Sequence, residues 1–304
     1  MIGRIFYWVL NMSITATVTG LVVLAVRSVR AVPRRVAVFL WTVPLIRMCL
    51  PFGIGNRYSL MSLISQYTTK TVIVARPLPK VEFSTMNSVQ LAYEYFPLTF
   101  KSPVLDKLFV AAGIVWVAAA AVILAVIGAV YVSSLRKTKS ARHEGGNVWT
   151  SGEIQSPAVY GIIKPKIVLP EGLAEQGKRY VVMHEAIHAR RGDNLWRLIG
   201  FIAAAVHWFN PMAWVFLKFF LTDLELACDE AAASRLDEGE RKEYAAALLR
   251  CAAGGDVFAS AFGGAKLKPR IRSILSFKKM TVLSAAFFAL LAAAIVFLLV
   301  TNAG

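Results

Sequence analysis

Four long apolar segments are the feature that most constrains what this chain can fold into. They lie at about residues 5–26, 36–54, 108–132 and 280–300, and each is near the roughly 20 residues that cross a bilayer as a helix. Charged residues make up only 17% of the 304 residues, whereas soluble domains carry roughly 25%. The sequence therefore predicts a mainly α membrane protein with four transmembrane helices, and it excludes a cytosolic enzyme with one large core.

The basic residues between the apolar segments predict their orientation, because cytoplasmic loops are enriched in Lys and Arg. The connection 27–35 carries four Arg and no acidic residue, and basic clusters follow the third segment and precede the fourth. We therefore expect 27–35 and 133–279 to be cytoplasmic, and 55–106 and both termini to be extracellular.

This topology divides the chain into five parts. They are the first two helices with a short basic loop, an extracellular loop, the third helix, a cytoplasmic membrane-associated domain, and the fourth helix with a short tail. Their bounds are 1–54, 55–106, 107–133, 134–279 and 280–304. In the extracellular loop, β-like runs predict either a small sensor hairpin or a linker on the membrane; they are 71–75 and 81–84. Membrane topology accounts for the net charge of +16, so no direct contact with nucleic acid is expected.

The strongest chemical signal is an H-E-x-x-H motif in a helical pattern, formed by His184, Glu185 and His188. Residues four apart share one face of a helix, so the two imidazoles can bind one metal ion. Glu185 lies beside them and can take a proton from a water molecule whose pKa the metal lowers. Only four His occur in the chain, and two of them form this motif. The motif predicts a Zn²⁺-dependent hydrolase with Glu185 as the catalytic base.

An acidic stretch downstream offers the third protein ligand that a catalytic zinc site needs. Glu225 and Asp229 are one helical turn apart in an otherwise apolar pattern, which disfavours a fully solvated acidic face. We predict Glu225 as the third ligand and Asp229 as the acceptor of a hydrogen bond from the other ring nitrogen of a ligand His. Asp223 and Glu230 are the alternative ligands.

Several other positions allow two interpretations each. His207, in an apolar stretch, is either a structural hydrogen-bonded residue or a transition-state stabiliser. Asp193 either caps the motif helix or hydrogen-bonds a metal ligand. Cys228 is interpreted as a small buried residue rather than a ligand. Residues 148–170 predict short strands, either a structural hairpin or an edge that aligns an extended substrate.

Residues 195–221 are apolar enough for a fifth span, yet the predicted ligands exclude a single crossing. His188 precedes the segment and Glu225 follows it, and metal–ligand bonds are about 2 Å whereas one crossing covers ~30 Å. The segment must therefore return to its starting side, and Asn210-Pro211 near its middle favours a bend. We predict two helices, 194–208 and 211–233, packed on the motif helix and partly embedded in the inner leaflet.

The basic stretch 266–279 joins the predicted protease to the last apolar segment. It contains Lys, Arg and Pro269. If extended and accessible, it predicts a site of self-cleavage; the alternative is a helical extension of the last span.

The motif H-E-x-x-H followed by E-x-x-x-D is typical of gluzincin metallopeptidases, and the wider sequence resembles the BlaR/MecR-type membrane peptidases, antibiotic-sensing signal transducers of bacteria. The resembling pieces are 156–161, 164–170, 184–193, 207–211 and 225–230. The resemblance implies a bacterial cell membrane, a cytoplasmic gluzincin-like zinc metalloprotease domain with a small β-sheet, and Zn²⁺ bound by His184, His188 and Glu225. It does not extend to the C-terminal penicillin-binding sensor domain of those transducers, since only four residues follow the last apolar segment.

The function we predict is a zinc metalloendopeptidase that acts in signal transduction by cleaving itself or a cytosolic regulator. One alternative is a housekeeping protease for membrane-protein quality control or processing. Another is a non-catalytic receptor or scaffold with a structural zinc site, which the intact Glu185 disfavours. The expected partners are the lipid bilayer, a protein or peptide substrate and, by the resemblance alone, a winged-helix transcriptional repressor. A homodimer is a further expectation.

Overall fold

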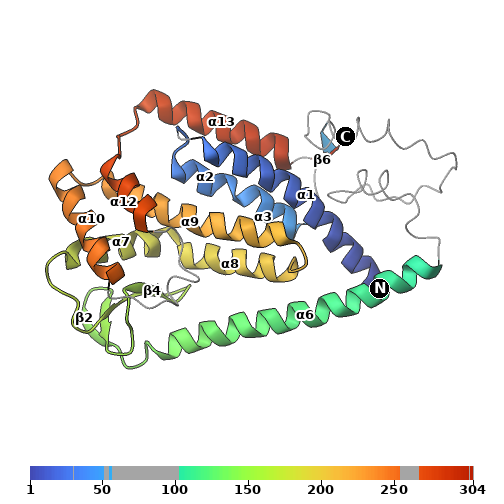
Figure 1. Ribbon diagram of the computed structural model, residues 1–304, viewed down its shortest axis with the longest axis horizontal. Coiled ribbons are helices and arrows are strands. Elements are labelled where there is room, and N and C mark those ends of the chain that lie inside the picture. The colour runs from blue at the N-terminus through green and yellow to red at the C-terminus, as the bar shows by residue number, and fades with distance from the viewer. Residues whose placement is uncertain (30, 51–54, 57–102, 254–266, 301, 304) are drawn as a thin grey trace.

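Helices make up most of the computed structural model, which describes residues 1–29, 31–50, 55–56, 103–253, 267–300 and 302–303 (Figure 1). The helices are α1 Ile2–Ser28, α2 Arg34–Leu40, α3 Thr42–Cys49, α6 Pro103–Arg136, α7 Lys178–Arg191, α8 Asp193–Val206, α9 Pro211–Ala233, α10 Glu238–Ala253, α12 Leu267–Leu275 and α13 Val282–Val300. The predicted β-like runs at 71–75 and 81–84 lie outside the described residues.

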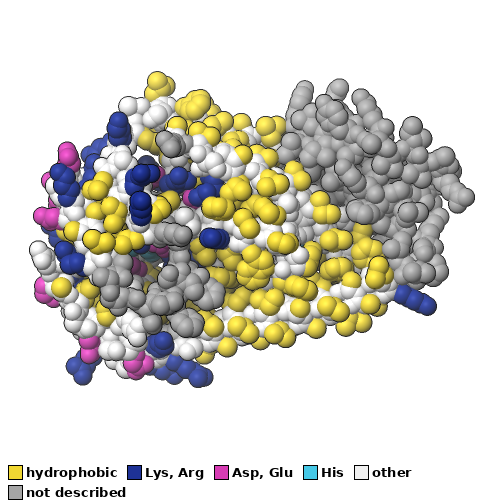
Figure 2. Space-filling view, in the orientation of Figure 1, with side chains coloured by type: hydrophobic (Ala, Val, Ile, Leu, Met, Phe, Trp, Pro, Cys, Tyr) yellow, Lys and Arg dark blue, Asp and Glu magenta, His cyan; other side chains and the backbone are white. Residues whose placement is uncertain are grey.

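Three helices in the described part of the chain are long and apolar enough to cross a membrane. They are α1, the 107–136 part of α6, and α13. These match the first, third and fourth predicted spans. In Figure 2, apolar side chains cover the middle of the visible face, and charged side chains gather at the end formed by α7, α10, α12 and the sheet. This separation of apolar and charged surface is expected for a protein that lies in a bilayer.

The second predicted span, 36–54, does not form one continuous helix in the described residues. The structure has two short helices there, α2 of 7 residues and α3 of 8, which meet at Trp41. Pro44 provides the physical reason: it has no N–H, so the carbonyl of Leu40 receives no bond from the residue four positions later. The described pair, up to Cys49, is shorter than the roughly 20 residues of a straight span.

The predicted hairpin at 194–233 is confirmed as α8 and α9, which pack on each other and on α7. Asn210 has the extended conformation expected before proline, with φ −95° and ψ 108°, and Pro211 is the first residue of α9. The Asn210 side chain accepts a hydrogen bond from Met212 N and donates to the hydroxyls of Ser13 and Thr17 on α1. The tip of the hairpin is therefore held against the first apolar helix.

Two cores hold the helices together. The larger one joins α1, α2, α3, α8, α9 and α13, and the smaller one joins α7, α9, α10 and α12. Helices α1 and α9 approach closely at Gly20, where an added Cβ would lie 2.2 Å from Cε2 of Phe216. Helix α9 belongs to both cores, so it links the apolar helices to the charged end of the molecule.

A small mixed sheet of four strands lies beside α7. Its strands are β2 Arg142–Gly145, β3 Val148–Ser151, β4 Ala158–Tyr160 and β5 Lys166–Pro170, in the order β2-β3-β5-β4. Strands β3 and β5 are parallel and the other pairs antiparallel. Strand β4 forms an edge next to α7, but Asn194 already donates to the carbonyls of Val159 and Gly161. These contacts favour the structural interpretation of 148–170.

The predicted self-cleavage stretch 266–279 is mostly helical. Residues 267–275 form the helix α12 instead of an extended segment. Its Ile274 side chain is fully buried and packs the helix against the protein. The stretch is not a helical extension of the last span either, because non-helical residues at 277–281 separate α12 from α13. Only the part after α12 is available as an extended chain.

Both chain termini lie at one end of the molecule. A second pairing joins β1 Gly55–Asn56, which follows α3, to β6 Asn302–Ala303 at the C-terminal end of the chain. Figure 1 shows both termini on the side away from α7 and α10. This arrangement fits the predicted topology, in which the termini and the domain 134–279 lie on opposite sides.

Candidate metal centre

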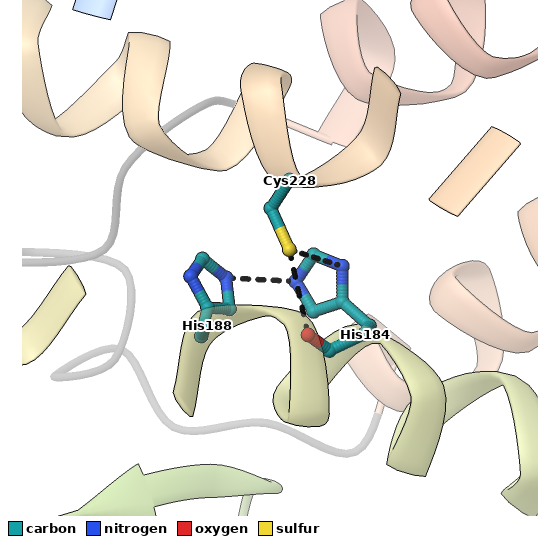
Figure 3. Close-up of side chains that lie close together, drawn as sticks. All are labelled: His184, His188 and Cys228. Carbon is teal, nitrogen blue, oxygen red and sulfur yellow. Dashed lines mark hydrogen bonds between the residues drawn. The ribbon is translucent and has the colours of Figure 1, made fainter. Parts of the chain in front are cut away.

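Helix α7 presents His184 and His188 on one buried face, as the four-residue spacing predicts (Figure 3). Their Nε2 atoms are 3.1 Å apart. The helix ends at Gly192, whose φ of 66° is in the left-handed region that suits a glycine after a helix. The chain then turns at once into α8, which begins at Asp193. This tight turn brings the side chain of Asp193 back to α7.

The other ring nitrogen of each His is bound to an oxygen. His188 Nδ1 lies 2.6 Å from Oδ2 of Asp193, and His184 Nδ1 lies 2.7 Å from the hydroxyl of Tyr244 on α10. The Tyr244 hydroxyl donates its proton to Asp229 Oδ1, 2.7 Å away, so it accepts from His184. Each Nδ1 is thus a donor, which leaves a lone pair on each Nε2. The two lone pairs face each other.

Glu225 on α9 brings a carboxylate to the same place. Its Oε2 is 3.7 Å from His184 Nε2, and its Oε1 is 3.6 Å from His188 Nε2. Two arginines pair with this carboxylate: Arg197 on α8, and Arg270 on α12 at 3.4 Å. The three predicted ligands therefore converge from two helices, α7 and α9. The turn between α8 and α9 brings the chain back so that they can meet.

Cys228 is a second candidate for the third ligand. Its sulfur, with His184 and His188, forms a group whose possible ligand atoms all lie within 4.8 Å of one another. Figure 3 shows the sulfur above His184, where it lies 3.5 Å from Nδ1 and donates to the backbone carbonyl at 3.4 Å. Nδ1 already has Tyr244 as its partner, whereas Glu225 lies near the Nε2 atoms of both rings. We therefore favour Glu225 as the ligand and Cys228 as its buried neighbour.

Asp229 lies near His184, as predicted, but it contacts that histidine mainly through Tyr244. Its Oδ1 is 3.4 Å from His184 Nδ1, and the shorter contact to that nitrogen comes from Tyr244. Asp229 orients Tyr244, and Tyr244 orients His184. Asp193 makes the direct carboxylate contact, but with His188. The outer partners of the two His are thus two carboxylates, one direct and one through a tyrosine.

Arg270 is a residue that the sequence interpretation missed. Its guanidinium binds both oxygens of Asp229, with distances of 2.8 and 3.0 Å, and its Nη2 is 3.1 Å from His184 Nε2. It comes from the stretch interpreted as a linker, and no motif marks it. In the sequence, an arginine in a basic stretch beside an apolar segment is explained by membrane topology. Only the packing of α12 shows that Arg270 belongs to this centre.

The electrostatics of the centre are those of a compact set of opposite charges. Burial alone would lower the pKa of His184, but interactions with Cys228 and Glu225 prevail and raise it to about 9. Burial would raise the pKa of Glu225, but His188, His184 and Arg270 hold it well below its ordinary value. Without a metal, a proton on the imidazoles therefore balances the Glu225 carboxylate. A divalent cation would take the place of that proton.

Glu185 lies between the two His in the motif and is half-buried. Its charge raises the pKa of Tyr160 on β4 and of Cys251 on α10, in each case adding to a larger effect of burial. The carboxylate therefore lies on the side of α7 that faces Tyr160 and Cys251.

Three other candidates lie elsewhere. His207 directly follows the C-terminal end of α8, whereas Asp193 begins that helix. The Nε2 of His207 donates to the carbonyl of Met48 at 3.0 Å, which fits the structural interpretation. Asp223 and Glu230, the alternative ligands, face α1 and α2 instead of the histidines. The structure thus gives both acids another role.

The residues present suit a metal ion such as zinc. Two imidazole nitrogens with free lone pairs and a carboxylate are a common ligand set of catalytic zinc. Carboxylate contacts to the remaining ring nitrogens of metal-ligating histidines are equally typical. The observation that decides the fit is that the two Nε2 atoms lie 3.1 Å apart with the Glu225 carboxylate beside both of them, so one metal ion could bind all three side chains.

Comparison with known proteins identifies the family of this chain. A family model described as BlaR1 peptidase M56 matches residues 7–274. The chain therefore belongs to the BlaR1 peptidase M56 family.

Individual relatives match over a shorter region. The regulatory protein BlaR1 of Bacillus licheniformis is 32% identical over 100 residues, which is 32% of this chain and 17% of that protein. The methicillin resistance mecR1 proteins of Staphylococcus aureus and Staphylococcus epidermidis are each 28% identical over 105 residues, which is 33% of this chain and 18% of each of them. The matched region is thus less than a fifth of each relative.

Proposed function

We propose that this protein is a zinc-dependent membrane endopeptidase that acts in signal transduction by cleaving itself or a cytosolic regulator. The observation that carries the proposal is the convergence of His184, His188 and Glu225, with Glu185 following His184 in the motif. A zinc ion bound there would supply Lewis-acid activation of a water molecule and of a peptide carbonyl. Family membership supports the peptidase class, and the names of the relatives support a regulatory role.

The side chains of the centre then have separate tasks. Glu185 takes a proton from the attacking water and delivers it to the amine nitrogen that leaves as the peptide bond breaks. Asp193 and the Tyr244–Asp229 pair keep the two imidazoles in the tautomer that binds metal. With a metal on His184 Nε2, Arg270 would give up its contact with that nitrogen but keep its pair with Asp229, and its positive charge would stabilise the negative charge that develops on the carbonyl oxygen.

The test compares the wild-type protein with Glu185→Ala, in detergent or vesicles, with and without a chelator. The wild type is expected to bind one zinc per chain and to cleave itself or a test peptide. The variant removes the base and no ligand, so it should keep the zinc and lose about 10²–10⁴-fold in cleavage rate. Equal cleavage by the two proteins would contradict the proposed mechanism.

A structural metal site is a second candidate, because Cys228 lies beside the two His. With Cys228 and Glu225 both bound, four protein ligands would close the site, as in structural zinc centres. Cys228→Ala separates the two functions. A closed site should lose most of its zinc affinity, whereas a catalytic site that uses Glu225 should keep both zinc and activity.

The partners and the membrane topology remain part of the proposal. The apolar helices support a multi-pass membrane protein. The bacterial relatives support a bacterial cell membrane, and the basic clusters at 27–35 and before the last apolar segment support a cytoplasmic protease. For self-cleavage we propose the non-helical segment 277–281, which is largely exposed and directly precedes α13. Mass spectrometry of fragments from the wild type and Glu185→Ala tests this site. Cuts in both proteins, or cuts elsewhere only, would contradict it.

A further inference from the structure

A second cluster of charges lies on α9, away from the candidate metal centre. Asp223 is fully buried, and Arg27 at the end of α1 binds both of its oxygens, with distances of 2.7 and 2.8 Å. The indole N–H of Trp41 donates to Oδ2 at 2.8 Å, and Arg34 donates to Oδ1 at 3.4 Å. Three side chains from the N-terminal helices thus enclose one carboxylate. We call this set the Asp223 cluster.

Glu230 adds a second contact to the same helices. Its two carboxylate oxygens accept hydrogen bonds from the backbone N–H of Arg34, at 3.0 and 3.1 Å. Arg34 is the first residue of α2, where backbone N–H groups have no partner within the helix. A carboxylate at this position also interacts favourably with the helix dipole. Glu230 therefore fixes the start of α2 to α9.

The two contacts and the metal centre use different faces of one helix. At about 100° per residue, Asp223 and Glu230 are separated by roughly 20° around α9, and Glu225 and Asp229 by roughly 40°. The midpoints of the two pairs are roughly 130° apart around the helix. One face of α9 therefore holds α1 and α2, and the other holds the candidate metal centre.

The buried charge makes this connection stiff. If α9 rotated or shifted along its axis, the Asp223 carboxylate would lose its arginine and indole partners in a site without water access. A buried charge without partners is strongly unfavourable. The same movement would displace Glu225, two residues away, while a metal site tolerates ligand displacements of only about 0.2 Å.

We propose that the Asp223 cluster is a positioning site: it couples the junction of α1 and α2 to the candidate metal centre by setting the rotation and height of α9. The inference rests on the proposed function, since it takes Glu225 as a metal ligand. It assigns to the N-terminal membrane helices a direct effect on zinc affinity. Arg27 and Trp41 act through Asp223, and neither side chain contacts a proposed metal ligand.

The test measures zinc affinity by competition with a chromophoric chelator in Trp41→Phe and Arg27→Met. Trp41→Phe keeps the aromatic packing and removes one hydrogen bond, and Arg27→Met removes the charge. Both are expected to weaken zinc binding, Arg27→Met by about tenfold, the lower end of the effect of an outer hydrogen-bond partner. Arg27→Lys should recover part of the loss. Lys242→Met, which removes an exposed ion pair with Glu238 on α10, is the control and should bind zinc as the wild type does.

A second measurement distinguishes positioning from a general loss of stability. Coupling is reciprocal, so zinc should slow hydrogen exchange at the N-terminal amides of α2, including Arg34 N–H. The effect should be absent in His188→Ala, which cannot bind the metal. Unchanged zinc affinity in both cluster variants, or zinc without effect on α2, overturns the inference while the proposed function stands. A wild type that binds no zinc overturns both.

Discussion

Two apolar regions of this molecule, α6 and the hairpin α8–α9, look alike in sequence and differ in structure. Both are long enough in apolar residues to cross a bilayer. On α6, side chains such as Val115, Val122 and Val126 are largely exposed, so the helix needs lipid as its solvent. In the hairpin, Ala203, Phe220 and Leu224 are buried by other helices. Apolar length alone therefore does not identify a span; what covers the apolar surface decides.

The reason for the difference is the chemistry at the two ends of the hairpin. The proposed metal ligands on α7 and on α9 lie together in the structure, so the chain between them has to return. The polar side chains of the tip are satisfied within the protein, since Asn210 binds Ser13 and Thr17. Helix α6 has no such requirement and carries the chain directly from one end of the molecule to the other (Figure 1).

The largest effect is expected from removing the ligand that the hairpin delivers. Glu225→Ala should abolish zinc binding and cleavage, because it removes a ligand and leaves Arg197 and Arg270 without their carboxylate partner. Cys228→Ala should retain both properties. Metal content by atomic spectroscopy, with circular dichroism to check the fold, measures the result. If Glu225→Ala kept zinc and activity while Cys228→Ala lost them, Cys228 would be the ligand. The return of the hairpin would then not be explained by Glu225.

Labelling from the two sides of the membrane tests the comparison directly. Single cysteines, Arg197→Cys on α8 and Lys218→Cys on α9, in a background without the three native cysteines, should react from the same side only. That side should be the cytoplasmic one. By contrast, cysteines at Lys107 and Arg136, the two ends of the long apolar part of α6, should react from opposite sides. If Lys218→Cys reacted from outside, the hairpin would be a span like α6.

A smaller effect is expected from the residue at the turn between α7 and α8. Asp193→Ala should weaken zinc binding by about 10–100-fold, since it removes the oxygen that lies 2.6 Å from His188 Nδ1. Tyr244→Phe should weaken binding similarly through His184. Titration with a competing chelator gives both values. Affinity unchanged in Asp193→Ala would return this residue to the role of a helix cap.

The smallest effect contrasts a buried glycine in close contact with α9 and a half-buried glycine with open space beside it. Gly20→Ala places a methyl group against the ring of Phe216 on α9 and should destabilise the protein by about 1–3 kcal/mol. Gly128→Ala on α6 meets no atom within 4 Å and should be neutral or stabilising by up to about 1 kcal/mol. Unfolding in mixed micelles measures both changes. Equal effects would show that α1 and α9 pack less closely than the structure indicates.

Much of the fold was accessible from local sequence patterns. The H-E-x-x-H spacing predicted two histidines on one face, and Asn210-Pro211 predicted the bend between two helices. Both depend on conformational rules that act over a few residues. The span predicted at 36–54 was wrong as a single helix in its described part, because Pro44 interrupts the hydrogen-bond ladder. That signal was present in the sequence and was outweighed by the apolar composition around it.

The sequence by itself determined the class of this protein: apolar runs of bilayer length, a metal-binding motif on a helix, and an acidic helix that returns to it. Only the tertiary structure decided which acid serves which purpose. Asp223 and Glu225 are two residues apart, yet one binds Arg27, 196 positions earlier, and the other faces the histidines. Tyr244 and Arg270 join the centre in the same way, from helices that carry no motif. Periodicity fixes which side of a helix a residue occupies, but its partner depends on how helices distant in sequence pack together.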